Sequence, residues 1–126
     1  MGDVFFYYAP DGQIPKTQPF ATIVTKDYPD EPPSGLERAG AFRLNISVGT
    51  AEFRALIGRD PREQNPPDIA LSAPDVILTH PVYGHLAWLA VVGPAERTST
   101  KALELLDSAH RDARARFQRR SGEAAP

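Results

Sequence analysis

One segment of the chain alternates strictly between apolar and polar side chains. In FRLNISV, residues 42–48, every second side chain from Phe42 onward is apolar and those between are polar. This period of two predicts a strand with one buried and one polar face. Arg43 and Asn45 lie on the polar face. Solvent exposure is the simpler interpretation of that face, and the alternative is that the two residues floor a groove.

The pattern then changes to a helical period. Thr50 is the expected N-cap of a short helix. Phe53, Leu56 and Ile57 recur at spacings of three and four, which predicts one buried helix face. Gly58 fits the helix stop.

Three further segments predict strands. Residues 3–9 and 20–26 are rich in aromatic and β-branched side chains. Residues 85–92, HLAWLAVV, are apolar on both faces, which predicts a covered strand with Trp88 in the core. The preceding DVILTHP, residues 75–81, is interpreted either as a short helical turn or as an extended lead-in.

The last element is a long helix over about 99–119. Its apolar stripe, at spacings of three and four, is Leu103, Leu106, His110, Ala113 and Phe117. The order β-β-β-α-β-α predicts an α+β domain with an antiparallel sheet and helices packed on one face. We expect a single domain over 1–120 and a disordered tail over 121–126.

Composition excludes several kinds of site. The 126 residues include no cysteine, which rules out disulfides, thiolate nucleophiles and Cys-rich metal centres. The start lacks the pattern of a signal peptide, and no apolar stretch approaches the roughly 20 residues that span a bilayer. We therefore expect a cytoplasmic protein with no membrane partner.

Charge is unevenly distributed along the chain. The formal net charge of −2 argues against a nucleic-acid partner. Acidic residues gather in one loop and arginines in the C-terminal helix, where cations suit the negative end of the helix dipole. The loop acids are Asp27, Asp30, Glu31 and Glu37, and the helix arginines are Arg111, Arg114, Arg116, Arg119 and Arg120.

The sequence carries no motif for phosphate loops, dinucleotide binding, zinc proteases or serine hydrolases. No cofactor is therefore expected. His80 and His85 are five positions apart, whereas metal ligands would be expected at i, i+4 on a helix or i, i+2 on a strand. We predict no metal site and expect both rings to hydrogen-bond loop backbone.

The candidate chemistry lies just before the fourth predicted strand. A packed loop aromatic is the favoured interpretation of Tyr83; the alternative is that His80 and Tyr83 form an acid–base or ligand-binding pair on a loop, so both are candidate site residues. Lys26 and Tyr28 follow the second strand, where strand-edge charge and a loop anchor are the favoured interpretation. The alternative is that they reach the same pocket as Tyr83. The candidate ligand-binding residues are Tyr28, Lys26, Arg43, Asn45, His80, Tyr83 and His85.

The blocks GDVFFYYAPDG, QPFATIVTKDYP, FRLNISVGTAEFRALIG and HPVYGHLAW resemble an actinobacterial family, the domain of unknown function numbered 6194. The resemblance runs from Gly2 to about Phe117. The family has no established activity, so the resemblance implies none.

Residues 42–117 also resemble, more remotely, the MmcQ/YjbR proteins. That resemblance implies a CyaY-like α+β fold and DNA binding. Tyr83 and Trp88 stand where that group has an aromatic and a tryptophan. Leu86 and Ala87 replace its basic residues, which weakens the DNA-binding interpretation.

Members of the first family usually carry a helical segment ahead of the first strand. If such a helix covers a sheet face, Phe5 and Tyr7 are exposed here, and exposed apolar patches usually find a partner. We expect a homodimer through this strand-one aromatic face.

Three functional hypotheses follow. The first is a small-molecule or protein-binding module with its site near His80 and Tyr83. The second is a cofactor-independent enzyme of secondary metabolism, in which these two residues and Tyr28 transfer protons. The third is DNA binding through the arginine-rich helix, which predicts a steep salt dependence.

Overall fold

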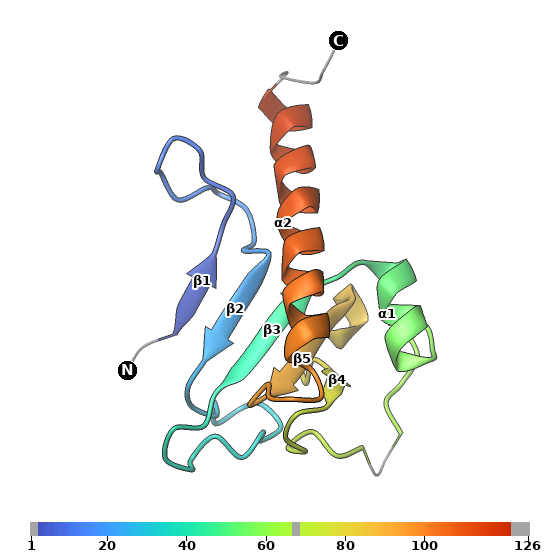
Figure 1. Ribbon diagram of the computed structural model, residues 1–126. Helices are drawn as coiled ribbons and strands as arrows, with labels where there is room; N and C mark the ends of the chain where they lie inside the picture. Colours follow the sequence, from blue (N-terminus) through green and yellow to red (C-terminus); the bar gives the residue numbers. More distant parts are fainter. Residues whose placement is uncertain (1–2, 67–68, 122–126) are drawn as a thin grey trace.

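A computed structural model describes residues 3–66 and 69–121 as an antiparallel sheet with two α-helices (Figure 1). The elements in chain order are β1 (Val4–Phe6), β2 (Ala21–Val24), β3 (Arg43–Ser47), α1 (Thr50–Ile57), β4 (Ile77–Thr79), the 3₁₀ turn η1 (Gly84–Leu86), β5 (Trp88–Val92) and α2 (Ser99–Ser121). The predicted α+β class is confirmed. The predicted tail begins at Ser121, which is the last residue of α2, and its remainder lies outside the described residues.

The sheet has the order β1-β2-β3-β5-β4, and every neighbouring pair is antiparallel. β3 lies at its centre, with Asn45 opposite Thr22 on one side and Ala90 on the other. β4 is an edge strand inside the segment for which a helical turn or a lead-in was expected. The observed order is therefore β-β-β-α-β-β-α, with one strand more than predicted.

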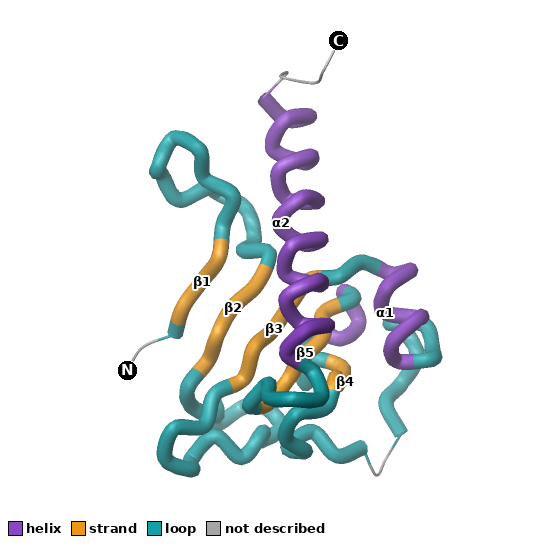
Figure 2. The backbone as a smooth tube through the Cα atoms, viewed as in Figure 1, coloured by secondary structure: helices purple, strands orange, loops and turns teal. Residues whose placement is uncertain are grey.

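Both helices pack on one face of the sheet. α2 crosses that face and α1 lies beside it (Figures 1 and 2). The buried cluster combines Leu44 and Ile46 of β3 and Leu89 of β5 with Phe53 of α1 and Leu105 of α2. The alternate residues of β3 thus supply the helix side of the core, as the sequence pattern predicts.

The predicted stripe of α2 is correct in part: Leu106 and Ala113 pack against the buried cluster, but the most deeply buried positions differ from those predicted. Ala102, Leu105 and Ala109 are buried, whereas Leu103 is 67 % exposed. The buried positions Ala102, Leu105 and Ala109 are spaced by three and four, so they form one helix face in which a leucine packs between two small alanines. His110 is exposed, although its ring contacts those of Tyr8 and Phe20.

The fourth predicted strand begins later than expected. Residues 84–86 form η1, and Ala87 has a left-handed φ of 64°, so β5 starts only at Trp88. His85 and Leu86 are consequently exposed. Trp88 is only half-buried, which corrects its predicted place in the core.

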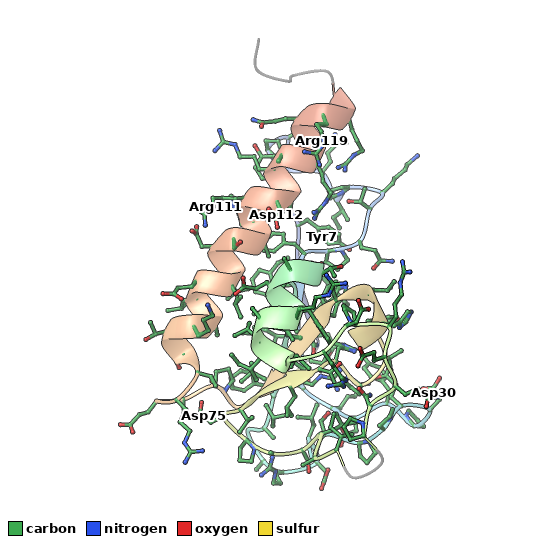
Figure 3. All side chains as sticks on the ribbon, turned by 90° about the vertical axis from the view of Figure 1, so that its right-hand side faces the viewer. Tyr7, Asp30, Asp75, Arg111, Asp112 and Arg119 are labelled. Carbon is green, nitrogen blue, oxygen red and sulfur yellow. The ribbon has the colours of Figure 1, made fainter. Side chains whose placement is uncertain are left out.

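Asp75 ties the start of α2 to the sheet. Its carboxylate accepts hydrogen bonds from the backbone N–H groups of Ala95, Arg97 and Thr98, at 2.8, 2.9 and 3.0 Å. It also accepts one from the Thr98 hydroxyl at 2.6 Å. These bonds lower the pKa of Asp75 to about 2, with the Thr98 hydroxyl contributing most. Figure 3 shows Asp75 at the foot of α2 and Arg119 near its other end.

The opposite face of the sheet is covered in part by the loop between β2 and β3 (Figure 2). Leu36 of that loop packs with Val24 and Val92 in a second buried cluster. Figure 3 shows Asp30 of the same loop on the side of the molecule away from α2. Neither face of β3 is therefore open to solvent at its centre, which corrects the simpler interpretation of Arg43 and Asn45.

No helix in residues 3–66 and 69–121 is long and apolar enough to cross a membrane.

Candidate functional site

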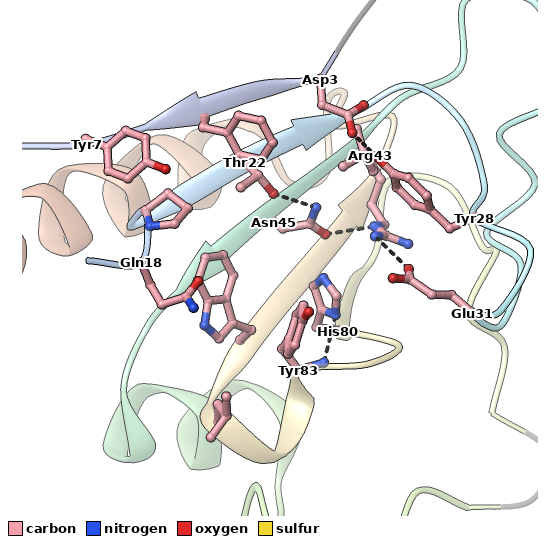
Figure 4. A pocket seen from close by; sticks show the side chains of 15 residues that line it. Asp3, Tyr7, Gln18, Thr22, Tyr28, Glu31, Arg43, Asn45, His80 and Tyr83 are labelled. Atoms are coloured by element: carbon pink, nitrogen blue, oxygen red, sulfur yellow. Dashed lines mark hydrogen bonds and ion pairs between the residues drawn. The ribbon is translucent and has the colours of Figure 1, made fainter. Parts of the chain in front are cut away.

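A pocket of about 430 Å³ opens on the sheet face that carries no helix (Figure 4). Side chains of β1, β2 and β3 form its floor. The loop after β2 closes one side and the segment 80–88 closes another. Its volume lies within the range of small-molecule sites.

A chain of hydrogen bonds runs along the floor. The Arg43 guanidinium donates from Nε to Asn45 Oδ1 at 2.8 Å and from Nη1 to Ser34 Oγ at 2.9 Å. Asn45 Nδ2 in turn donates to Thr22 Oγ1 at 2.9 Å. Arg43 is 4 % exposed and Asn45 is 1 % exposed. Arg43 and Asn45 therefore lie on the floor of the pocket, which corresponds to the second of the two interpretations of this strand face.

Arg43 is a buried cation with acidic neighbours. Burial lowers the pKa of its guanidinium, and the negative charges of Glu31, Asp27 and Asp3 oppose that effect. An arginine stays protonated under such conditions because its pKa starts so high. Among the residues that the structure describes, Glu31 is the one acid that forms an ion pair with Arg43, at a long Nη2–Oε1 distance of 3.9 Å.

The acidic loop is held in place by its own carboxylate. Asp27 accepts hydrogen bonds from the backbone N–H groups of Ser34, at 2.7 Å, and Leu36, at 3.0 Å. Burial raises the pKa of Asp27, but these hydrogen bonds outweigh it and the net pKa is lowered. Asp27 therefore fixes the loop that presents Ser34 to Arg43.

Tyr28 joins the loop to the beginning of β1. Its hydroxyl donates a hydrogen bond to the carboxylate of Asp3, and that bond is the main cause of a raised pKa for Tyr28. Asp3 also accepts from the backbone N–H of Thr25 at 3.3 Å. The phenol is thus held as a neutral donor at the pocket wall.

His80 is buried and neutral. Its Nδ1 accepts hydrogen bonds from the backbone N–H groups of Val82 and Tyr83, at 3.0 and 2.9 Å. An accepting Nδ1 places the ring proton on Nε2. Burial, followed by the positive charge of Arg43, lowers the pKa of His80 to about 3. The prediction that its ring would bind loop backbone matches this geometry.

Aromatic and aliphatic side chains complete the walls. Tyr83 stacks near His80, with ring centroids 5.1 Å apart, and His80 contacts Trp88 at 6.2 Å. Phe5 and Tyr83 are 56 % and 47 % exposed, although both line the pocket. The pocket thus combines a polar floor with accessible aromatic surfaces, as small-molecule sites commonly do.

Five of the predicted ligand-binding residues line this one pocket: Tyr28, Arg43, Asn45, His80 and Tyr83. Lys26 does not line it; its ammonium lies 5.8 Å from the centre of the Tyr28 ring instead. His85 does not line it either. Its Nδ1 is 3.2 Å from the Val82 carbonyl, beside a second hollow.

Sequence reasoning missed several lining residues. Asp3, Gln18 and Glu31 reach the pocket from segments far apart in the chain. Their polar character could have marked them as candidates, but no spacing rule links them to Arg43. Among the described residues, no group of three or more histidine or acidic side chains could hold a metal ion.

Comparison with known proteins assigns the chain to a family but not to an activity. No curated protein and no solved structure matches it. Residues 1–122 match the model of a family described as "Family of unknown function (DUF6194)". The match spans nearly the whole sequence and agrees with the resemblance of its sequence blocks to this family. The chain therefore belongs to the DUF6194 family.

Proposed function

We propose that this protein is a small-molecule-binding module and that its ligand occupies the pocket over β3. The observation that carries the proposal is the buried Arg43 on the floor of a pocket of about 430 Å³. Burying a charge is costly unless it is fully paired. A guanidinium that still has N–H groups directed at a cavity is therefore more readily explained by a ligand than by folding.

The geometry favours binding over the acid–base enzyme hypothesis. A general base needs an available lone pair and a pKa near the working pH. His80 Nδ1 already accepts two backbone hydrogen bonds, and the pKa of the ring is lowered to about 3. His80 is suited instead to donate a fixed hydrogen bond from Nε2.

A ligand screen tests the proposal. We expect members of a metabolite library to raise the midpoint of thermal unfolding and to change the fluorescence of Trp88, the only tryptophan in the chain, which lines the pocket. Tyr83→Ala should weaken these effects, because Tyr83 is a wall residue that is exposed enough to be removed without disturbing the core.

The matched control is Leu103→Ala, which removes an exposed apolar side chain from α2 away from the pocket. Hits should bind this variant as tightly as the wild-type protein. A library in which no compound gives a Tyr83-dependent response would contradict the proposal.

A further inference from the structure

The unused hydrogen-bonding capacity of Arg43 indicates what kind of group the pocket takes. A guanidinium has five N–H groups. Nε and one N–H of Nη1 are bonded to Asn45 and Ser34. The nearest carboxylate to Nη2 is that of Glu31 at 3.9 Å, which is longer than a hydrogen bond. Within the described residues, Nη2 therefore has no hydrogen-bond acceptor.

The other acids near Arg43 are already engaged. Asp27 accepts two backbone N–H groups of its own loop and does not line the pocket. Asp3 accepts the Tyr28 hydroxyl and the Thr25 N–H. Of the described acids, Glu31 is the one within ion-pair distance of Arg43, and its side chain is 23 % exposed. Its loose contact can therefore be exchanged for a better acceptor.

A second donor lies in the same pocket. His80 carries its ring proton on Nε2, and no hydrogen bond to this atom is formed within the described part of the chain. Figure 4 shows His80 below Arg43, with Glu31 to one side. The floor is therefore rich in donors, while its walls are aromatic.

We propose that the ligand is an aromatic carboxylic acid whose carboxylate replaces Glu31 at Nη2 of Arg43 and whose ring packs on Phe5 and Trp88. This inference rests on the proposed binding function. A carboxylate accepts charge-assisted hydrogen bonds from a guanidinium in a fixed, often bidentate geometry. Glu31 then acts as a built-in competitor that neutralises Arg43 while the pocket is empty.

Three probes of one shape and different charge test the inference. They are 3-phenylpropionate, the neutral 3-phenylpropanamide and the cationic 3-phenylpropylamine, titrated while the fluorescence of Trp88 is recorded. We expect the acid to bind at least roughly tenfold more tightly than the other two, since only it forms a charge-assisted pair with Arg43. Arg43→Lys should reduce this preference, because an ammonium keeps the charge but cannot reproduce the fork of N–H groups.

Arg43 is buried and its variant can fail to fold, so Glu31→Gln provides an independent test. Removing the competing charge should tighten binding of the acid several-fold and leave the amide unchanged. Asp30→Asn is the matched control: it makes the same charge change on the same loop at an exposed residue that does not line the pocket.

The outcomes separate this inference from the proposed function. Equal binding of acid and amide overturns the preference for a carboxylate and leaves a small-molecule pocket. Tighter binding of the amine overturns it in favour of a cation held by Glu31. If none of the three probes binds at millimolar concentration, the proposed carboxylate preference is also overturned. The library screen tests the binding function separately.

Discussion

Arg43 and Asn45, two residues apart on β3, hydrogen-bond to each other on the sheet face that carries no helix, with Nε 2.8 Å from Oδ1. Antiparallel sheets often leave one face to solvent. Here that face is partly covered by the loop after β2, so the polar residues are buried and must satisfy one another. Asn45 links Arg43 to Thr22 and is therefore the centre of the floor.

Asn45→Ala should destabilise the fold, because it leaves the buried Nε–H donor of Arg43 without a hydrogen-bond acceptor. Leaving a buried polar group unpaired costs about 1–3 kcal/mol. Chemical denaturation measures the free energy of unfolding. Thr22→Val removes only the hydrogen bond between Asn45 Nδ2 and Thr22 Oγ1, at a half-buried residue, and should lower the free energy of unfolding by less. An Asn45→Ala protein as stable as the wild type would show that the network carries no stability.

His80 should make stability depend on pH between about 6.5 and 3. Its pKa is lowered in the folded protein, so the unfolded chain binds a proton more readily. The contribution of His80 to the free energy of unfolding is fully present above a pH of about 6.5, the pKa of histidine in the unfolded chain. It is lost as the pH falls towards 3, by an amount on the order of a few kcal/mol.

His80→Asn checks this window, because its Oδ1 can accept the N–H groups of Val82 and Tyr83 without titrating. Unfolding midpoints measured across pH 7 to 4 should vary less in the variant. An unchanged slope would assign the dependence to another group.

Asp75 should control stability at lower pH. Its pKa is lowered from 3.8 to about 2, so its contribution is present above 3.8 and disappears as the pH falls towards 2. Asp75→Asn should lower the thermal midpoint at neutral pH and flatten the profile below pH 4. Asp30→Asn makes the same change at an exposed loop residue and should do neither. If the two variants behave equally, the hydrogen bonds of Asp75 do not stabilise the start of α2.

Gly84→Ala should destabilise the segment 80–88 through a steric clash. A Cβ at this residue would fall well inside van der Waals distance of Thr79 Oγ1. Thr79 is buried, and overpacking of such a site costs about 1–3 kcal/mol. The double variant Gly84→Ala/Thr79→Ala removes the clashing atom and should recover part of the loss, as a double-mutant cycle would measure. Absence of coupling between the two substitutions would exclude this contact as the cause.

Self-association through the strand-one aromatic face stays a prediction, although Tyr7 is partly buried and only Phe5 of the two named aromatics is exposed. Val4 and Phe5 are 46 % and 56 % exposed on an edge strand, a common site of pairing between chains. Light scattering coupled to size exclusion should give the mass of a dimer, and Val4→Lys should shift it towards the monomer. Phe5 lines the pocket, so Val4 is the cleaner substitution. A monomeric wild-type protein would contradict the prediction.

Elements with a single strong period were predictable from the sequence. β3 alternates with a period of two. α1 places Phe53 in the core and ends at Ile57, followed by Gly58 in the left-handed conformation of a helix stop; the N-cap, however, is Gly49, and Thr50, the expected N-cap, is the first helical residue. Local patterning determines such elements because neighbouring residues alone define which side is buried.

The remaining elements depend on tertiary contacts. Ala87 adopts a positive φ, which cannot be predicted from an alanine in the sequence. The apolar pattern therefore predicts a strand where residues before β5 form a turn. In α2 the most deeply buried residues include Ala102 and Ala109, while Leu103 faces solvent. Spacing cannot reveal either feature, because both depend on which elements pack against the segment.

Part of the pocket lining could be predicted from the sequence, but Lys26 and His85 lie outside it and the assembly could not be predicted. His80, Tyr83 and Tyr28 were recognised as loop residues with suitable chemistry, and all three line the pocket. Glu31 was assigned only to an acidic loop. Its contact with Arg43 joins residues 12 positions apart through the covering of a sheet face, which no local motif encodes.

The alternation of β3 gives substitutions on its two faces different consequences. Leu44 and Ile46 face the helices, whereas Arg43 and Asn45 face the pocket, and Asn45 lies between two residues of the core. Substitutions of Leu44 or Ile46 therefore act on the hydrophobic layer, whereas substitutions of Arg43 or Asn45 change the pocket floor and the stability of the fold together. Glu31 of the covering loop lines the pocket without belonging to that buried layer.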